Sequence, residues 1–175
     1  HAGPHDKAAE YYASRREVAS WILAAEAWDK ASESAGGAVR ARAAWERVVN
    51  ASGRTRAQEE KARFRRMQIT RPKEGDPAAV ADAKWLATNA LDDKVFSEAA
   101  ELLEKQSPPK LLTADELLAR SRVLAEGLRT DDAIRAIERA GTRTTADRKN
   151  IPAIDLCRAK AEVYYKARTR YPEAA

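Results

Sequence analysis

The densest group of chemically active side chains in this sequence is a basic segment at 54–73, which also contains the aromatic Phe64. Several cations on one face can bind the phosphates of a nucleic acid, and an aromatic ring among them can stack on a base. Glu59 and Glu60 lie in the same segment, so a solvated helix face is the competing interpretation. Within it we take six residues as candidate polyanion-binding residues: Arg54, Arg56, Lys61, Arg63, Arg65 and Arg66.

Residue types that enzymes and metal sites commonly use are scarce. Both histidines, His1 and His5, lie at the N-terminus, and the single cysteine, Cys157, can form neither an internal disulfide nor a zinc site by itself. The chain has no glycine-rich phosphate-binding motif. The acidic pairs at 92–93 and 131–132 are typical of helix starts, where carboxylates cap free amides. The sequence therefore predicts no catalytic, cofactor-binding or metal-binding residue.

Composition indicates a helical protein. Charged residues make up 34% of the 175 residues and aromatic residues only 6%, as in helices with solvated outer faces. The net charge of +5, from 32 basic and 27 acidic side chains, fits an anionic partner such as a nucleic acid or a wall polymer, but it also simply favours solubility. No apolar run reaches about 18 residues, so we expect no membrane span.

Hydrophobic spacing places helices along the N-terminal part of the chain. One long helix is predicted from Asp6 past Trp28, and the segment 32–37 with its Gly36-Gly37 pair ends this helix. Further helices are predicted at 39–51 and from about 55 towards Pro72. Trp21, Trp28 and Trp45 are expected in the core or between hairpins. This organisation comprises a tail or cloning scar at 1–5, helical hairpins at 6–70 and a connector at 71–77, with Asp76 and Pro77 opening the next helix.

Residues 78–175 show a more regular pattern of helices. They are predicted at 78–91, 97–105, 113–128, 131–140 and 151–169, with a capping box formed by Thr113 and Glu116 and a polar loop at 142–150. The last of these helices is expected to bury or half-bury five residues, namely Ile154, Cys157, Ala161, Tyr164 and Tyr165. A partner helix only begins at Tyr171, so we expect this region to be truncated at its C-terminus.

Three similar segments recur in this region, at 96–100, 130–134 and 171–175. Glu98 and Asp132 are 34 residues apart, and Glu173 follows Asp132 after 41 residues. A period near 34 is that of a helix-hairpin repeat, and the loop at 142–150 accounts for the longer second interval. The predicted fold class is all-α, with stacked helical hairpins.

The segments 96–100 and 171–175 resemble the aromatic-x-Glu-Ala start of the second helix in tetratricopeptide-type repeats. In those repeats a small residue in the first helix allows close packing, and the corresponding positions here are Ala87, Ser121 and Glu162, of which the first two are small. The glycine and tryptophan landmarks of that family are mostly missing. The resemblance covers 78–175 and implies a short right-handed superhelix, that is, an α-solenoid.

A narrower resemblance is carried by 112–120, 132–138, 157–161 and 170–175. These segments are similar to the helical superhelix that precedes the catalytic domain in soluble lytic transglycosylases, which cleave peptidoglycan. The catalytic acid of that family is a Glu followed by Ser, and the one such pair here, Glu33-Ser34, is interpreted as a helix-end turn. The resemblance thus implies an accessory, non-enzymatic domain of a periplasmic enzyme. Without it the localisation stays open.

Three functional hypotheses follow from the sequence. The leading one is a non-catalytic helical-repeat scaffold that binds a protein or a cell-wall polymer on its concave face. Its candidate contact residues, chosen by helical phase as exposed, are Trp85, Arg120, Arg122, Lys160 and Tyr164. The alternative is a binder of nucleic acid or another polyanion through the basic segment, with an affinity that falls steeply with salt. The third is a catalytic domain of unrecognised kind.

Overall fold

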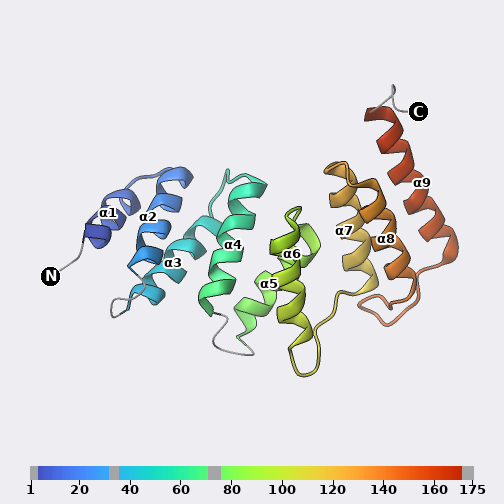
Figure 1. Cartoon of the computed structure of the whole chain (residues 1–175), viewed down its shortest axis with the longest axis horizontal. Coiled ribbons are helices and arrows are strands. Elements are labelled where there is room, and N and C mark those ends of the chain that lie inside the picture. Colours follow the sequence, from blue (N-terminus) through green and yellow to red (C-terminus); the bar gives the residue numbers. More distant parts are fainter. Residues whose placement is uncertain (1–3, 32–35, 71–75, 171–175) are drawn as a thin grey trace. The chain divides into compact units, whose positions relative to one another are not determined.

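The computed structural model describes residues 4–31, 36–70 and 76–170, and these residues form helices joined by turns (Figure 1). The helices within these ranges are α1 (Pro4–Ala13), α2 (Val18–Lys30), α3 (Gly37–Val49), α4 (Arg56–Thr70), α5 (Pro77–Asn89), α6 (Asp93–Glu104), α7 (Ala114–Glu126), α8 (Thr130–Gly141) and α9 (Ala153–Arg170). The described ranges contain no β-strand, only an isolated bridge between Thr144 and Asn150. The predicted all-α class is confirmed.

The chain divides into two compact units, one ending at Ala83 and the other starting at Lys84. The division lies within α5, so the first half of this helix belongs to the first unit and its second half to the second. The predicted connector at 71–77 lies outside the described residues except for Asp76 and Pro77.

In the first unit, α2 packs between α1 and α3, and α3 also packs against α4. The core is built around Trp45, which is fully buried together with Val48 and Ala62. The Trp45 indole donates a hydrogen bond of 3.0 Å to Asp29 Oδ2, so the polar atom of this large side chain is satisfied. Trp28 is buried as well, which confirms the expected core role of these two tryptophans. Trp21 is half-buried beneath the Arg47 guanidinium, whose carbon lies 4.1 Å from the ring centroid.

The predicted long helix starting at Asp6 is wrong, because the chain breaks between Ala13 and Val18. The Ser14 hydroxyl donates to the Tyr11 carbonyl, a local bond that competes with helix continuation. Glu17 has extended backbone angles, φ −113° and ψ 136°, and begins α2. The break gives two shorter helices that pack against each other. α1 begins at Pro4 and so includes two residues of the predicted tail.

Helix starts and turns largely follow the local sequence signals. Gly36 and Gly53 adopt φ of +83° and +77°, a region that favours glycine. The Asp76 carboxylate accepts a 2.8 Å bond from the Ala78 amide at the start of α5. Thr113 and Glu116 form the predicted capping box, with each side chain accepting a bond from the amide of the other residue. The predicted helix start at Asp76 and the predicted capping box of Thr113 and Glu116 are confirmed, and each depends on neighbouring residues alone.

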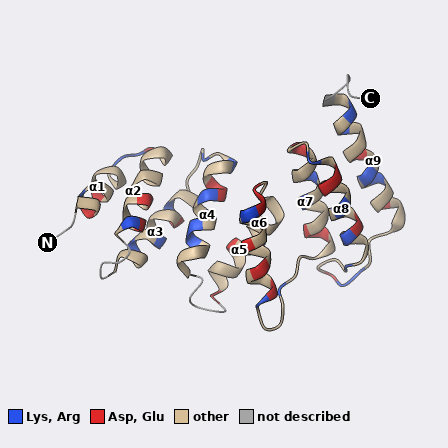
Figure 2. Ribbon diagram, in the orientation of Figure 1, with Lys and Arg blue, Asp and Glu red and all other residues tan. Residues whose placement is uncertain are grey.

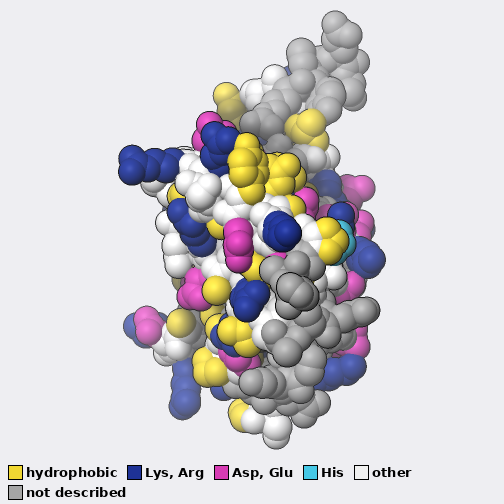
Figure 3. All heavy atoms as spheres, turned by 90° about the vertical axis from the view of Figure 1, so that its left-hand side faces the viewer, with side chains coloured by type: hydrophobic (Ala, Val, Ile, Leu, Met, Phe, Trp, Pro, Cys, Tyr) yellow, Lys and Arg dark blue, Asp and Glu magenta, His cyan; other side chains and the backbone are white. Residues whose placement is uncertain are grey.

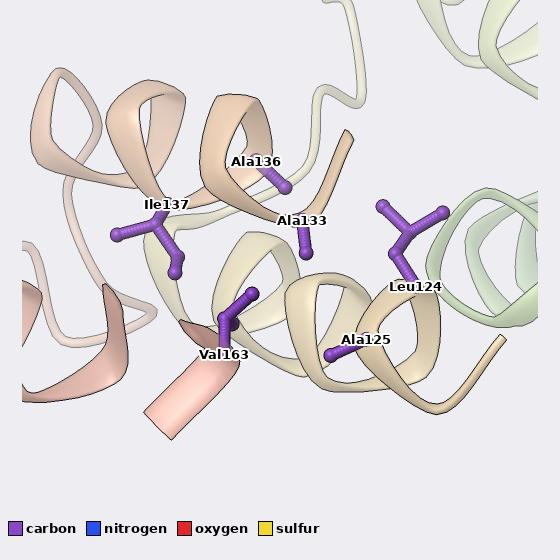
Figure 4. Close-up of a cluster of buried hydrophobic side chains, with 6 residues drawn as sticks. All are labelled: Leu124, Ala125, Ala133, Ala136, Ile137 and Val163. Carbon is purple, nitrogen blue, oxygen red and sulfur yellow. The ribbon is translucent and has the colours of Figure 1, made fainter. Parts of the chain in front are cut away.

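In the second unit, α7 packs against α8 and α9, and α8 also packs against α9. Figure 4 shows the buried cluster that these three helices share: Leu124, Ala125, Ala133, Ala136, Ile137 and Val163. The predicted start of a helix at Ser97 is wrong by four residues. Asp92 accepts a 3.0 Å bond from the Val95 amide, which caps α6 earlier and places Phe96 in its first turn.

Candidate functional site

The face of α9 that the sequence predicts to be buried or half-buried is exposed. Tyr165 is 71% exposed, Ile154 67% and Tyr164 57%, and Cys157 and Ala161 are exposed too. The helix has apolar residues on two opposite sides, and its other side, with the buried Val163 and the partly buried Leu156 and Ala159, packs on the core cluster. We call the exposed set the outer face of α9: Ile154, Cys157, Ala161, Tyr164 and Tyr165.

The outer face of α9 is a candidate for partner binding. Its residues recur at intervals of three, four and seven, so they form one stripe along the helix. Exposed apolar side chains that lie together are characteristic of interaction sites, and tyrosine is enriched there because it combines an apolar ring with a polar hydroxyl. One residue of the predicted contact set, Tyr164, lies on this face.

The other predicted contact residues are distributed over different helices. Lys160 on α9 forms a 2.9 Å ion pair with Glu138 of α8, and this hydrogen bond raises the pKa of Lys160. Arg122 on α7 is exposed and lines a groove between α7 and α9. Trp85 on α5 is half-buried. The structure therefore does not assemble the predicted contact residues into one site.

The groove between α7 and α9 has a volume of about 220 Å³. Its walls carry charges of both signs, and Arg158 Nη1 lies 3.6 Å from Asp155 Oδ1 within it. The residues that line it are Leu118, Ser121, Arg122, Ala125, Asp155, Arg158, Ala159, Glu162, Val163 and Lys166. Three basic side chains and two acidic ones face this groove, so it favours a polar ligand of mixed charge over a purely apolar one.

Arg120 is buried, and its expected exposure is wrong. Its side chain is only 6% exposed, and its guanidinium carbon lies 3.8 Å from the centroid of the Phe96 ring. The Nη1 atom donates bonds of 3.1 Å to the carbonyl oxygens of Ala87 and Ala90, at the end of α5. Carbonyl groups at the C-terminal end of a helix lack amide partners within that helix and carry partial negative charge, so they can accept hydrogen bonds from a cation. Burial, followed by the nearby charge of Arg129, lowers the pKa of Arg120 to about 10.

Arg120 lines a second cavity of about 180 Å³, which we call the arginine pocket. It is formed by Asp93, Phe96, Leu117, Arg120, Arg129, Asp132, Arg135, Ala136 and Arg139. Arg129 Nη2 lies 2.8 Å from Asp93 Oδ1 and 2.6 Å from Asp132 Oδ2. Arg135 binds the other oxygen of Asp132, and these hydrogen bonds from Arg135 and Arg129 hold the pKa of Asp132 below its ordinary value.

Sequence reasoning did not find the arginine pocket, although one signal for it was present. Arg120 lies between Leu117 and Leu124 on the apolar stripe of α7, and Leu86, 34 residues earlier, is fully buried. A cation on the apolar stripe of its own helix indicates a role that hydrophobic packing alone does not explain.

Most described cations of the basic segment are neutralised within the first unit. Figure 2 shows basic and acidic positions side by side on α4. Arg54 and Arg63 bind Glu59, Arg63 and Arg66 bind Asp82, Arg65 binds Asp29, and Lys61 binds Glu26. On the face in Figure 3, charges of both signs are also interspersed. This pairing leaves less uncompensated positive charge for a polyanion than the sequence alone indicates.

The pKa values in this network follow from the same contacts. Burial raises the pKa of Glu59, but hydrogen bonds from Arg54 and Arg63 outweigh it and hold the pKa below its ordinary value of 4.5. The hydrogen bond to Asp82 raises the pKa of Arg66. Asp82 is fully buried, and its two oxygens accept bonds of 2.6 Å from Arg66 and 3.0 Å from Arg63.

Several other sequence features have a plain outcome or lie outside the described residues. Asp92 caps α6, and Asp131 and Asp132 lie in the first turn of α8, as predicted for acidic pairs at helix starts. Three features lie outside the described residues: Glu33-Ser34, His1 and the third of the similar segments, at 171–175. Within 4–31, 36–70 and 76–170 no cluster of three or more His, Cys, Asp or Glu side chains could hold a metal ion. None of the described helices is long and apolar enough to span a membrane.

Comparison with known proteins leaves the function of this chain to be inferred from its own contacts. No protein-family model, no curated protein and no solved structure matches the sequence. The surfaces of the described part from which we infer a function are the outer face of α9, the groove beside it and the arginine pocket.

Proposed function

We propose that this protein is a non-catalytic helical-repeat scaffold that binds a protein or a cell-wall polymer. The observation that carries the proposal is the outer face of α9, where two tyrosines and an isoleucine are more than half exposed. In this proposal the helical hairpins stack as a short right-handed superhelix, a tetratricopeptide-like α-solenoid, and the partner contacts exposed side chains along it.

Burial that recurs at the repeat interval supports the solenoid. The small residues at the predicted close-packing positions, Ala87 and Ser121, are both almost fully buried. Three further pairs at the same spacing of 34 are buried in both members: Ala90 with Leu124, Ala99 with Ala133, and Leu103 with Ile137. The third close-packing position, Glu162, is exposed, so the agreement covers two copies. Equivalent burial at equivalent positions is what stacked repeats require.

A narrower version of the proposal follows from a sequence resemblance. The segments 112–120, 132–138 and 157–161 resemble the superhelix of soluble lytic transglycosylases. In this version the chain is the accessory domain of a peptidoglycan-cleaving enzyme in the periplasm, and its ligand is a cell-wall glycan or a protein bound to it. Tyr164 and Tyr165 suit such a ligand because an aromatic ring with a hydroxyl offers both an apolar face and a hydrogen bond.

The test compares the wild type with a double variant, Tyr164→Ser with Tyr165→Ser. Binding is measured by co-sedimentation with purified peptidoglycan sacculi, and by fluorescence anisotropy with peptides selected on the wild type from a random library. Loss of an interface hot spot costs about 2 kcal/mol, so we expect affinity to fall roughly 30-fold in whichever assay detects the partner.

The control is Tyr11→Ser, which removes a tyrosine that is 56% exposed on α1. Circular dichroism of each variant confirms that helix content is retained. Equal loss of affinity in Tyr11→Ser, or no binding of the wild type to sacculi and to any selected peptide, contradicts the proposal. Release of soluble fragments from sacculi by this chain alone contradicts its non-catalytic character.

A further inference from the structure

We propose that the arginine pocket binds an oxyanion group, a carboxylate or a phosphate, of a ligand. The pocket is formed by residues of α6, α7 and α8 together with Arg129, and it contains no residue of α9. It is therefore a second site, and the inference goes beyond the scaffold function proposed for the outer face of α9.

The charges in the pocket do not balance. Four arginines and two aspartates line it, which leaves a surplus of two positive charges. Both aspartates are engaged by Arg129 and Arg135. Arg120 and Arg139 have no carboxylate partner among the residues that the structure describes. An anion entering the pocket would thus meet two guanidinium groups that form no ion pair with a described carboxylate, although the charges of Asp93 and Asp132 act on Arg120.

Of these two arginines, Arg139 is exposed and Arg120 is buried, and burial is unusual for an arginine without an ion pair. A buried charge is costly unless it is paired with an opposite charge and hydrogen-bonded. The carbonyl bonds from Nη1 to Ala87 and Ala90 satisfy part of the guanidinium but do not neutralise it. Its Nε and Nη2 atoms make no hydrogen bond to any described residue. These two atoms form the fork that can hold both oxygens of a carboxylate or phosphate.

The surroundings would strengthen such a contact. Phe96, Leu117 and Ala136 supply apolar walls between the charged side chains, and because Arg120 is buried, water screens its charge less than that of an exposed arginine. The volume of about 180 Å³ exceeds several-fold the roughly 30 Å³ that one water molecule occupies in the liquid, so a single oxyanion group has room to enter. The Phe96 ring lies against the guanidinium, with its centroid 3.8 Å from the guanidinium carbon.

The experiment is a titration of the ¹⁵N-labelled full chain with inorganic phosphate and, separately, with sodium acetate, each at an ionic strength matched by sodium chloride. Amide and arginine Nε–H signals are followed by NMR. We expect saturable shifts confined to Arg120 and to the backbone of 92–97 and 129–139. The arm with the tighter dissociation constant distinguishes a phosphate ligand from a carboxylate ligand.

Two charge-removing variants give the matched comparison. Arg139→Gln removes an exposed pocket cation, and a charge-assisted hydrogen bond is strong enough that we expect anion affinity to fall about tenfold. Arg168→Gln removes an exposed cation of α9 outside the pocket and should leave affinity unchanged. Arg120→Met should abolish the saturable shifts. If that variant does not fold, the shift of the Arg120 Nε–H signal in the wild type provides the same test.

Three results would overturn the proposal. The first is the absence of saturable shifts with both anions. The second is a set of shifts that sodium chloride reproduces or that spreads over all exposed arginines, since this would be general screening of charge. The third is an equal affinity of Arg139→Gln and the wild type for both anions.

Discussion

At the residue scale, several charged side chains of the first unit are engaged in ion pairs within that unit. Asp82 is the clearest case, because it is fully buried and accepts hydrogen bonds from both Arg63 and Arg66. The Coulomb attraction and the hydrogen bonds offset the cost of burying these groups only while all the partners are present. One carboxylate thus pairs with two arginines, Arg63 and Arg66, that the sequence analysis took as candidate polyanion-binding residues.

The first prediction concerns Asp82. Replacing it (Asp82→Ala) leaves Arg66 and Arg63 without their shared partner, and we expect the free energy of unfolding to fall by about 3–5 kcal/mol. Asp82→Asn keeps the shape and should cost less. Urea denaturation followed by circular dichroism measures both. The exposed Asp147 is the control, and Asp147→Asn should change stability by no more than about 0.5 kcal/mol. A similar effect of both aspartates would contradict the role of this network.

The second prediction concerns the pH dependence of stability. The folded-state pKa values of Glu59, Asp76 and Asp132 lie below their ordinary values of 4.5, 3.8 and 3.8. Their ionised forms therefore stabilise the fold fully above those values, and the contribution is lost as the pH falls through the folded-state pKa. We expect unfolding free energy to decline from about pH 5 downward. Urea denaturation at a series of pH values measures this decline. Glu59→Gln should reduce the slope of unfolding free energy against pH. An unchanged slope would contradict a contribution from Glu59.

At the element scale, the hydrophobic pattern of α9 is compatible with burial of either of two opposite sides of the helix. Both of its sides carry apolar residues, and the side with Leu156, Ala159 and Val163 packs on the core while the outer face stays exposed. The sequence pattern could not choose between the two sides, because the choice depends on which surface α7 and α8 present. Local signals, such as the capping box of α7 and the Asp76 cap of α5, were predictable because each involves residues a few positions apart.

The third prediction uses two isoleucines on neighbouring helices. Ile137 on α8 is fully buried, whereas Ile154 on α9 is 67% exposed. Truncating a buried isoleucine removes contacts and leaves a cavity, so Ile137→Ala should lower the free energy of unfolding by about 2–5 kcal/mol. Ile154→Ala should change it by no more than about 0.5 kcal/mol. Comparable losses in urea denaturation would show that the outer face of α9 is covered in solution.

At the scale of the whole molecule, a net charge of +5 is less informative than the way the charges are paired. In the first unit, four basic side chains of α4 pair with carboxylates from α2, α4 and α5, namely Lys61, Arg63, Arg65 and Arg66. In the second unit, the arginine pocket keeps a surplus of two positive charges. The arginine pocket thus offers a local surplus of positive charge, which suits one oxyanion group better than a long polyanion.

The fourth prediction tests polyanion binding through 54–73. Because Asp82, Glu59 and Asp29 already pair with the arginines of α4, we expect single-stranded DNA to bind weakly, with a shallow dependence of affinity on salt. A protein that neutralises Z phosphates loses affinity with a log–log slope of roughly −0.7 Z on single strands. Fluorescence anisotropy over a salt series measures this slope. A steep slope that disappears in Arg56→Gln with Lys61→Gln would favour the alternative function.

The sequence by itself determined the helical class and local signals such as the capping box of α7 and the Asp76 cap of α5, because each arises from residues close together along the chain. Only the tertiary structure decided which face of α9 is exposed and that Arg120 is buried. These outcomes depend on contacts between residues far apart in sequence, such as the bonds of Arg120 to Ala87 and Ala90. No spacing within one helix can specify such contacts, since the partner surface is formed by other helices.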